Sequence, residues 1–112
     1  MSKVYHDKQL AFESRERTFP EDFLEVAECD SDDLGEIFEI TNHIQQAWWL
    51  NEGVRKTIDG QARSTSVGDV VVLSDGKVYV VQSIGWSIVG NVADSPLIFK
   101  TGYSEIGDTD GK

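Results

Sequence analysis

The sequence predicts an α+β fold, a small antiparallel sheet of four or five strands in a meander with one main amphipathic helix packed on it. Runs of β-branched and aromatic residues, separated by turn residues, fill the second half of the chain, and a stretch with helical periodicity lies in the first half. The 112 residues suffice for one core. We therefore expect a single domain over 1–112, frayed at 1–3 and 104–112.

Two strands are expected before the helix. The first covers Lys3 to Phe12 and the second runs from Phe23 to about Cys29, because both segments contain residues that favour a half-buried pleated surface. The polar run from Glu13 to Thr18 between them predicts a loop.

The helix is expected to begin at about Ser31 and to end around Gln46. Good N-cap residues cluster at 30–32, and the acidic residues that follow suit the positive end of the helix dipole. Leu34, Ile37 and Phe38 recur at the spacing of one helix face.

Two tryptophans follow the helix. Trp48 and Trp49 are adjacent, so they cannot point in the same direction, and we expect one in the core and the other partly exposed. The polar stretch from Asn51 to Ser66 has no clear period and predicts a long irregular connection.

The second half of the chain predicts consecutive strands. Asp75 and Gly76 separate the runs 70–73 and 77–84, which indicates a hairpin with a type I′ turn. A third strand, 86–89, is expected after Gly85, where glycine favours a bulge or a sharp bend, and 97–103 is a candidate for the last.

Charge and composition exclude several functions. The formal net charge of −10 opposes direct binding to nucleic acid, because phosphates repel such a surface. No apolar stretch approaches the length that spans a bilayer, so we expect a cytoplasmic protein with no membrane partner. Cys29 is the single cysteine, which excludes an intramolecular disulfide and a four-thiolate metal site within one chain.

No motif indicates catalysis, a metal site or a cofactor, and we predict a non-enzymatic protein that needs none of them. An alternative is a small enzyme that uses His43 with Glu39 or Asn42, although a cation near the end of a helix explains His43 as well. The neighbouring acids are expected to raise the pKa of the Cys29 thiol and so to lower its nucleophilicity.

The string Arg63-Ser64-Thr65-Ser66-Val67-Gly68-Asp69-Val70 is the most distinctive local pattern. Asp69 and the hydroxyls are suited to cap backbone groups where the chain enters a buried strand. The alternative is that Arg63, Ser64 and Thr65 line a contact site.

The acidic residues are distributed unevenly. Between Arg17 and Arg55 there are ten acidic residues and no lysine or arginine. Gathered on one face, they would attract a partner with a basic surface, and acids at helical spacing would imitate the phosphates of a nucleic acid. The plain alternative is that these acids are solvated and serve solubility. We predict a partner-binding set of Glu21, Asp22, Glu25, Glu28, Asp32, Asp33, Glu36, Glu39 and Trp49.

The chain also resembles a known family. The strings LGEIFEITNHI at 34–44, WW at 48–49 and RSTSVGDVVVL-SDG-KVYVVQSIGW at 63–86 are similar to the YodL-like domain of plasmid and phage proteins. The similarity covers about half of the chain. It implies a mobile-element setting, in which acidic proteins often disarm host defences, and it transfers no catalytic residue.

The leading hypothesis is therefore an acidic interaction protein of a mobile genetic element. Its partner would be a host DNA-binding or defence protein with a basic surface, and DNA mimicry or antirestriction would be one form of that activity. The alternative is a structural or accessory module without mimicry, which self-associates as a homodimer through a sheet edge or through Trp49.

Overall fold

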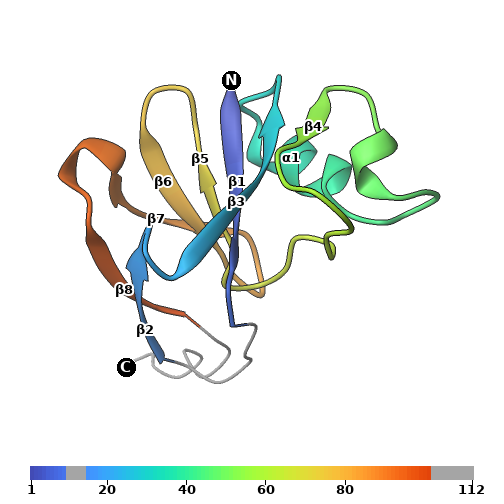
Figure 1. The fold of residues 1–112 in the computed structure, drawn as a ribbon. Helices are drawn as coiled ribbons and strands as arrows, with labels where there is room; N and C mark the ends of the chain where they lie inside the picture. The colour runs from blue at the N-terminus through green and yellow to red at the C-terminus, as the bar shows by residue number, and fades with distance from the viewer. Residues whose placement is uncertain (10–14, 102–112) are drawn as a thin grey trace.

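The computed structural model describes residues 1–9 and 15–101, and Figure 1 shows their arrangement. Eight strands, one α-helix and two short 3-10 helices occur in this part of the chain. In chain order the elements are β1 (Ser2–Asp7), β2 (Arg15–Phe19), β3 (Phe23–Cys29), α1 (Leu34–Ile40), η1 (Trp48–Leu50), β4 (Val54–Lys56), β5 (Val70–Val72), β6 (Lys77–Val81), β7 (Trp86–Asn91), η2 (Val92–Asp94) and β8 (Leu97–Thr101).

The strands form two sheets. Six of them pair in the order β4-β3-β1-β5-β6-β7, and β2 pairs with β8 in a separate two-stranded sheet. Every pairing is antiparallel, as expected. The first and the last described strands, β1 and β8, therefore lie in different sheets, with β1 in the interior of the larger one.

Both faces of the six-stranded sheet are covered. On one face, Val4, Val26 and Val71 pack with Ile37 of α1 and with Trp48 of η1. On the other face, Phe19 of β2 and Phe23 pack with Val70 and Val78, and β8 adds side chains to this second cluster. The side chains of Val70 and Val71 thus point to opposite faces of the sheet and belong to different clusters, as the two-residue period of a strand requires.

The α+β class is consistent with this architecture, but the expected strand count and the single meander are wrong. The run from Glu13 to Thr18 was expected to be a loop, whereas Arg15–Phe19 forms β2, with Arg17 and Phe19 buried. Its partner β8 lies far along the chain, so local composition gave no sign of the pairing. The connection 51–66 likewise contains the short strand β4.

The first strand is shorter than expected, since β1 ends at Asp7, and 10–12 lie outside the described residues. The expected fraying of 1–3 is wrong for Ser2 and Lys3, because both belong to β1 and the Ser2 hydroxyl donates to Ser31 O at 2.7 Å. The strand predicted from Phe23 to about Cys29 is confirmed as β3. The end of the predicted last strand and the tail 104–112 also lie outside the described residues.

The helix ends earlier than its apolar pattern indicated. It begins at Leu34, with Asp33 as N-cap, instead of at about Ser31, and it ends at Ile40 instead of near Gln46. The Thr41 hydroxyl donates to Ile37 O at 2.8 Å, and the Asn42 amide donates to Phe38 O at 2.6 Å. These local bonds compete with continuation of the helix, which explains its early end.

The hairpin of β5 and β6 is confirmed, but its turn type is not. A type I′ turn needs positive φ at two positions, and no described non-glycine residue has positive φ. Only Gly76 of the turn does, at 90°, and Leu73 N donates to Lys77 O across a three-residue loop. Likewise, Gly85 has a positive φ of 76° in the next turn, whereas the bulge lies at Val89 within β7.

Candidate functional site

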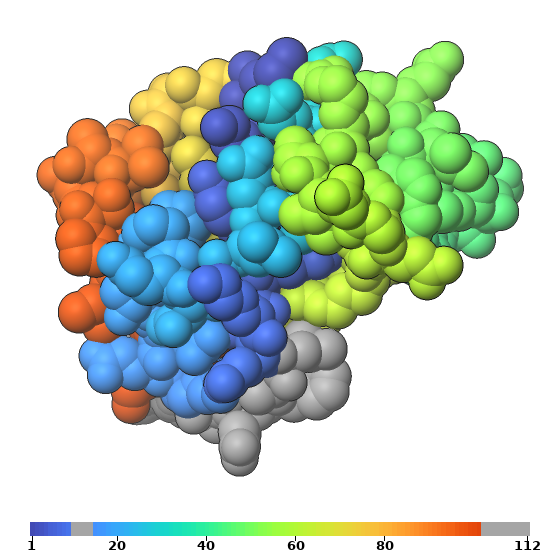
Figure 2. Space-filling model, viewed as in Figure 1, coloured from blue at the N-terminus to red at the C-terminus, as the bar shows by residue number. Residues whose placement is uncertain are grey.

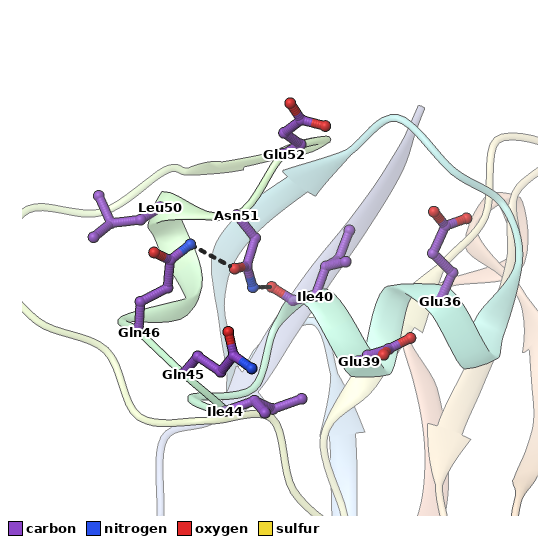
Figure 3. Close-up of a pocket in the computed structure, with 9 residues that line it drawn as sticks. All are labelled: Glu36, Glu39, Ile40, Ile44, Gln45, Gln46, Leu50, Asn51 and Glu52. Atoms are coloured by element: carbon purple, nitrogen blue, oxygen red, sulfur yellow. Dashed lines mark hydrogen bonds between the residues drawn. The ribbon is translucent and has the colours of Figure 1, made fainter.

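A groove of about 640 Å³ lies between α1 and the segment that follows it (Figure 3). One wall is the outer side of the helix, and the other is the loop leading into η1 together with the residues after it. The lining residues are Glu36, Glu39, Ile40, Ile44, Gln45, Gln46, Leu50, Asn51 and Glu52. In Figure 2 this part of the chain forms the green lobe at the right of the molecule.

The helical wall follows from the capping of α1. The Asp33 carboxylate accepts a hydrogen bond from Glu36 N at 3.0 Å, which closes the first turn. Ile37 is then fully buried against the sheet, so Glu36 and Glu39 are left exposed on the helix. The helix thus presents two carboxylates to the groove.

The opposite wall is held by side-chain amides and by His43. Asn51 Nδ2 donates to Ile40 O at 2.9 Å and Gln46 Nε2 donates to Asn51 Oδ1 at 3.0 Å, as drawn in Figure 3. His43 Nδ1 accepts from Trp48 N at 3.2 Å, while Nε2 lies 3.1 Å from Ala62 O. The imidazole therefore holds the loop between 43 and 48, and it does so beyond the end of the helix, not in its last turn.

The groove combines negative charge with exposed apolar surface. Glu36, Glu39 and Glu52 are exposed, and none of them forms an ion pair within the described residues. Ile44 and Leu50 are 68% and 63% exposed beside them. Such a surface is complementary to a segment that carries both basic and aliphatic side chains.

The remaining residues of the predicted partner-binding set lie elsewhere or have other contacts. Asp22 lies 3.8 Å from Arg17, Glu25 lies 3.8 Å from Lys3, and Glu28 lies 3.7 Å from Arg55. Glu21 is exposed in the turn between β2 and β3. The structure therefore brings Glu36 and Glu39 together, adds Glu52, and gives the acids of β3 basic neighbours.

The other three members of the set have structural contacts. Asp33 caps the helix, and Asp32 accepts from the Ser74 amide and hydroxyl at 3.0 and 2.9 Å, which lowers the pKa of its exposed carboxyl. Trp49 is partly buried, and the Lys56 ammonium lies 4.5 Å from the centre of its ring. As expected for the pair, Trp48 is in the core and Trp49 is only partly exposed.

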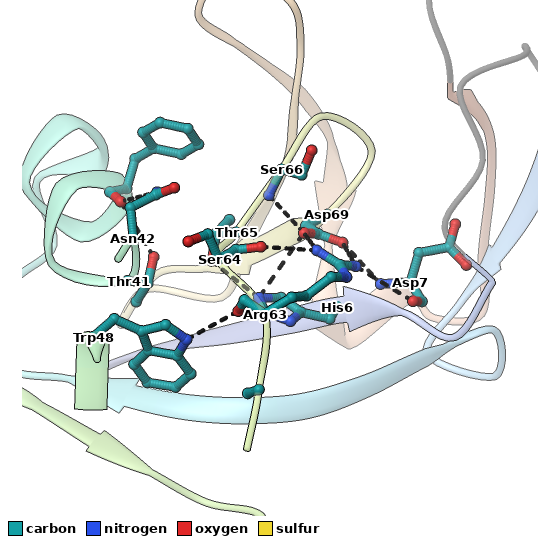
Figure 4. Close-up of polar contacts among 12 residues, drawn as sticks. His6, Asp7, Thr41, Asn42, Trp48, Arg63, Ser64, Thr65, Ser66 and Asp69 are labelled. Atoms are coloured by element: carbon teal, nitrogen blue, oxygen red, sulfur yellow. Dashed lines mark hydrogen bonds and ion pairs between the residues drawn. The ribbon is translucent and has the colours of Figure 1, made fainter. Parts of the chain in front are cut away.

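A second polar cluster lies under the RSTSVGD string (Figure 4). Asp69 is fully buried, and its carboxylate accepts two hydrogen bonds from the Arg63 guanidinium, at 2.7 and 2.8 Å. It also accepts from Ser66 N at 2.7 Å and from Asp7 N at 2.8 Å. The predicted capping role of Asp69 is therefore confirmed, and its charge is compensated inside the fold.

His6 adjoins this cluster. Its Nε2 lies 3.0 Å from the Thr65 hydroxyl and 3.9 Å from an Asp69 oxygen. Burial lowers the pKa of His6 to about 4, and the nearby Arg63 also lowers it, although the Asp69 charge acts in the opposite direction. At neutral pH the imidazole is thus uncharged and bonded internally.

Neither the cysteine nor the acids form a metal site in the described residues. Burial raises the pKa of the Cys29 thiol to about 11. Nearby acids raise this pKa as well, as the sequence predicted, but burial is the larger cause. In residues 1–9 and 15–101, no three His, Cys, Asp or Glu side chains lie close enough to hold a metal ion. No helix of that part has the length and apolar character needed to cross a bilayer.

Sequence reasoning missed the contributions of Ile44, Leu50 and Glu52 to the groove. Glu52 is one of the ten acidic residues of the run, but it lies beyond the predicted helix, so helical spacing did not place it beside Glu36 and Glu39. Leu50 is exposed because of the conformation of η1, which the sequence did not predict. Comparison of the chain with protein-family models, with curated proteins and with solved structures finds no match.

Proposed function

We propose that the chain is a non-enzymatic interaction protein that binds a basic, partly apolar surface of another protein in the groove beside α1. One observation supports this most strongly. Glu36, Glu39 and Glu52 are exposed without a described basic partner around the exposed side chains of Ile44 and Leu50.

Charge and apolar contact would play different roles in such binding. The net charge of −10 speeds encounter with a basic partner, and the carboxylates at the groove select lysine or arginine side chains. Ile44 and Leu50 supply apolar area that is removed from water in the complex, which stabilises it by roughly 25 cal/mol per Å² before the costs of association. Binding should therefore weaken with salt without vanishing.

The proposed partner is a host DNA-binding or defence protein, in line with the mobile-element setting that the YodL-like resemblance implies. Such proteins carry basic surfaces that normally meet phosphates. With seven residues, α1 is only about 10 Å long, so the helical acids imitate at most a short stretch of a nucleic-acid strand. The proposed contact is accordingly a short basic segment and not a long groove filled by a DNA-like surface.

The test is a capture experiment with two triple variants of equal charge. The groove variant carries Glu36→Gln, Glu39→Gln and Glu52→Gln. The control variant carries Glu21→Gln, Asp59→Asn and Asp94→Asn, which are exposed acids outside the groove. Each removes three negative charges, so they differ in where charge is lost and not in how much.

The immobilised wild-type chain and both variants are exposed to a bacterial lysate that has been treated with nuclease. We expect the wild type and the control variant to retain the same basic proteins, and the groove variant to lose them. If all three chains retain the same basic proteins, the proposal is contradicted. If both variants lose these proteins equally, the binding is unspecific attraction by net charge and the groove is not the binding site.

A further inference from the structure

The hairpin of β6 and β7 carries exposed apolar side chains on an uncharged stretch. From Val78 to Ala93 the sequence contains no Asp, Glu, Lys, Arg or His, in a chain whose net charge is −10. Ile84 at the tip of the hairpin is 92% exposed, and Ile88 on β7 is 55% exposed. An uncharged apolar patch on a strongly acidic protein indicates a contact surface.

Ile84 projects because of the turn that carries it. Gln82 N donates to Gly85 O at 2.9 Å, which closes the turn around Ser83 and Ile84. Gly85 has φ of 76°, a conformation that side-chain-bearing residues rarely adopt. The side chain of Ile84 is thereby held away from the core.

A hollow of about 180 Å³ lies directly beside this projecting side chain. Its walls come from α1 and from the hairpin itself, and the lining residues are Phe38, Val81, Gln82, Ser83, Gly85 and Trp86. Ser83 and Gly85 are the chain neighbours of Ile84. A projecting isoleucine and a hollow whose lining combines apolar Phe38, Val81 and Trp86 with polar Gln82 and Ser83 therefore belong to one patch.

The outer edge of β7 lacks a hydrogen-bonded strand among the described residues, although Leu97 of β8 lies close to Gly90. β7 is the last strand in the order of the six-stranded sheet and pairs with β6 on one side, and no other described strand pairs with it. The bulge at Val89 leaves Trp86 to Ile88 as its regular part. Such a short edge does not favour a long continuous sheet between molecules, so side-chain docking must carry the contact.

We propose that this hairpin is a self-association surface, in which Ile84 of each copy enters the hollow of a second copy of this chain. A two-fold axis makes both insertions at once, because projection and hollow are adjacent on the same patch. Charge opposes a second copy less at this place than at a charged surface. Two chains of net charge −10 repel each other, and the stretch from Val78 to Ala93 adds no local repulsion of its own.

This dimer would have a consequence for the acidic groove, although it does not rest on the proposed function. Phe38 of α1 lines the hollow, whereas Glu36 and Glu39 of the same helix line the groove. Pairing through the hairpin would thus bring two grooves into one particle, and a partner with two basic segments would bind more tightly than one with a single segment.

Sedimentation equilibrium of the purified chain at several concentrations tests the proposal without any partner. We expect the apparent mass to rise with concentration from 12.5 kDa toward twice that value. High salt should preserve or tighten the dimer, because it screens the repulsion between acidic copies, whereas it weakens binding at the groove. Failure of one proposal is therefore distinguishable from failure of the other.

Two matched variants locate the contact. Ile84→Ser should raise the dimer dissociation constant about tenfold or more, as for a residue central to an interface. Ile98→Ser removes a side chain that is 64% exposed on β8, outside the patch, and should leave the constant unchanged. Both positions are exposed, so the folded state should persist, which circular dichroism verifies. A wild type that stays monomeric, or equal association of wild type and Ile84→Ser, overturns the proposal.

Discussion

Arg63 and Asp69 form a two-fold hydrogen-bonded ion pair, with Nη1 to Oδ2 at 2.7 Å and Nη2 to Oδ1 at 2.8 Å. The pair links the connection after β4 to the residue just before β5. Because Asp69 also accepts from Asp7 N, it ties β1 to the same place. This buried cluster therefore orders three segments that are distant in the chain.

Removal of the Asp69 charge should be strongly destabilising. Asp69→Asn replaces the fully buried carboxylate by a neutral amide and weakens its two hydrogen bonds from Arg63, whose side chain is 31% exposed. We expect the free energy of unfolding to fall by about 1.5 to 3 kcal/mol. Asp75→Asn is the control, because Asp75 and Lys77 form an exposed pair and such pairs contribute about 0 to 1 kcal/mol. Urea denaturation measures both. Similar losses in the two variants would contradict the role of the buried pair.

The buried His6 should make stability depend on pH in a defined window. Its pKa is about 4 in the folded chain and 6.5 in the unfolded chain, so between these values the unfolded state binds more protons. The stability that comes from the neutral imidazole is full above about pH 6.5 and is lost as the pH falls toward about 4. Its total is on the order of 3 kcal/mol.

The control for that prediction is His6→Gln, which keeps a polar side chain at the position. Thermal or urea unfolding is followed for both chains across the window. The wild type should lose more stability than the variant as the pH falls, since the carboxylates titrate in both. Parallel pH profiles would show that the pKa of His6 is the same in the folded and the unfolded chain, which contradicts the prediction.

Trp48 in the core and Trp86 beside the hollow should differ sharply in their effect on stability. Trp48 is fully buried and its Nε1 donates to Arg63 O at 2.9 Å, so Trp48→Ala should cost about 3 to 5 kcal/mol. Trp86 is 36% exposed, and Trp86→Ala should cost less. Denaturant titration measures the free energy of unfolding of both variants. Equal losses in Trp48→Ala and Trp86→Ala would mean that the core does not centre on Trp48.

The turn glycines allow a test of local packing. Gly76 and Gly60 both have positive φ, and an added Cβ would lie 2.9 Å from Asn91 Oδ1 at Gly76 but would meet nothing within 4 Å at Gly60. Both alanine variants carry backbone strain of about 1 kcal/mol or more. Gly76→Ala should be the more destabilising in thermal unfolding, and the reverse order would speak against the close approach of Asn91.

Local patterns predicted the elements whose signals are local. The strand Phe23–Cys29 and the Asp75-Gly76 hairpin were both visible in composition and turn chemistry, whereas the helix begins three residues later than predicted. The pairing of β2 with β8 was not visible, because a five-residue strand with four polar or charged residues is stabilised by a partner about eighty residues away.

The candidate site was predicted only in part for a similar reason. Glu36 and Glu39 were identified from helical spacing, since spacing along one helix is a local property. The sequence placed Ile44 on the same helix, but the helix ends at Ile40, so Ile44 lies in a loop and is exposed. The ion pairs of Glu25 and Glu28 depend on neighbouring strands and had no signal in the acidic run itself.

The groove beside α1 is proposed to bind a basic, partly apolar segment. The decisive measurement is a titration of the isotope-labelled chain with a short peptide of alternating lysine and leucine, followed through the backbone amide signals. We expect saturable shifts at Glu36, Glu39, Ile44, Leu50 and Glu52 that shrink with salt. Shifts centred on Glu21 to Glu28, or no saturable shift at the groove, would contradict it.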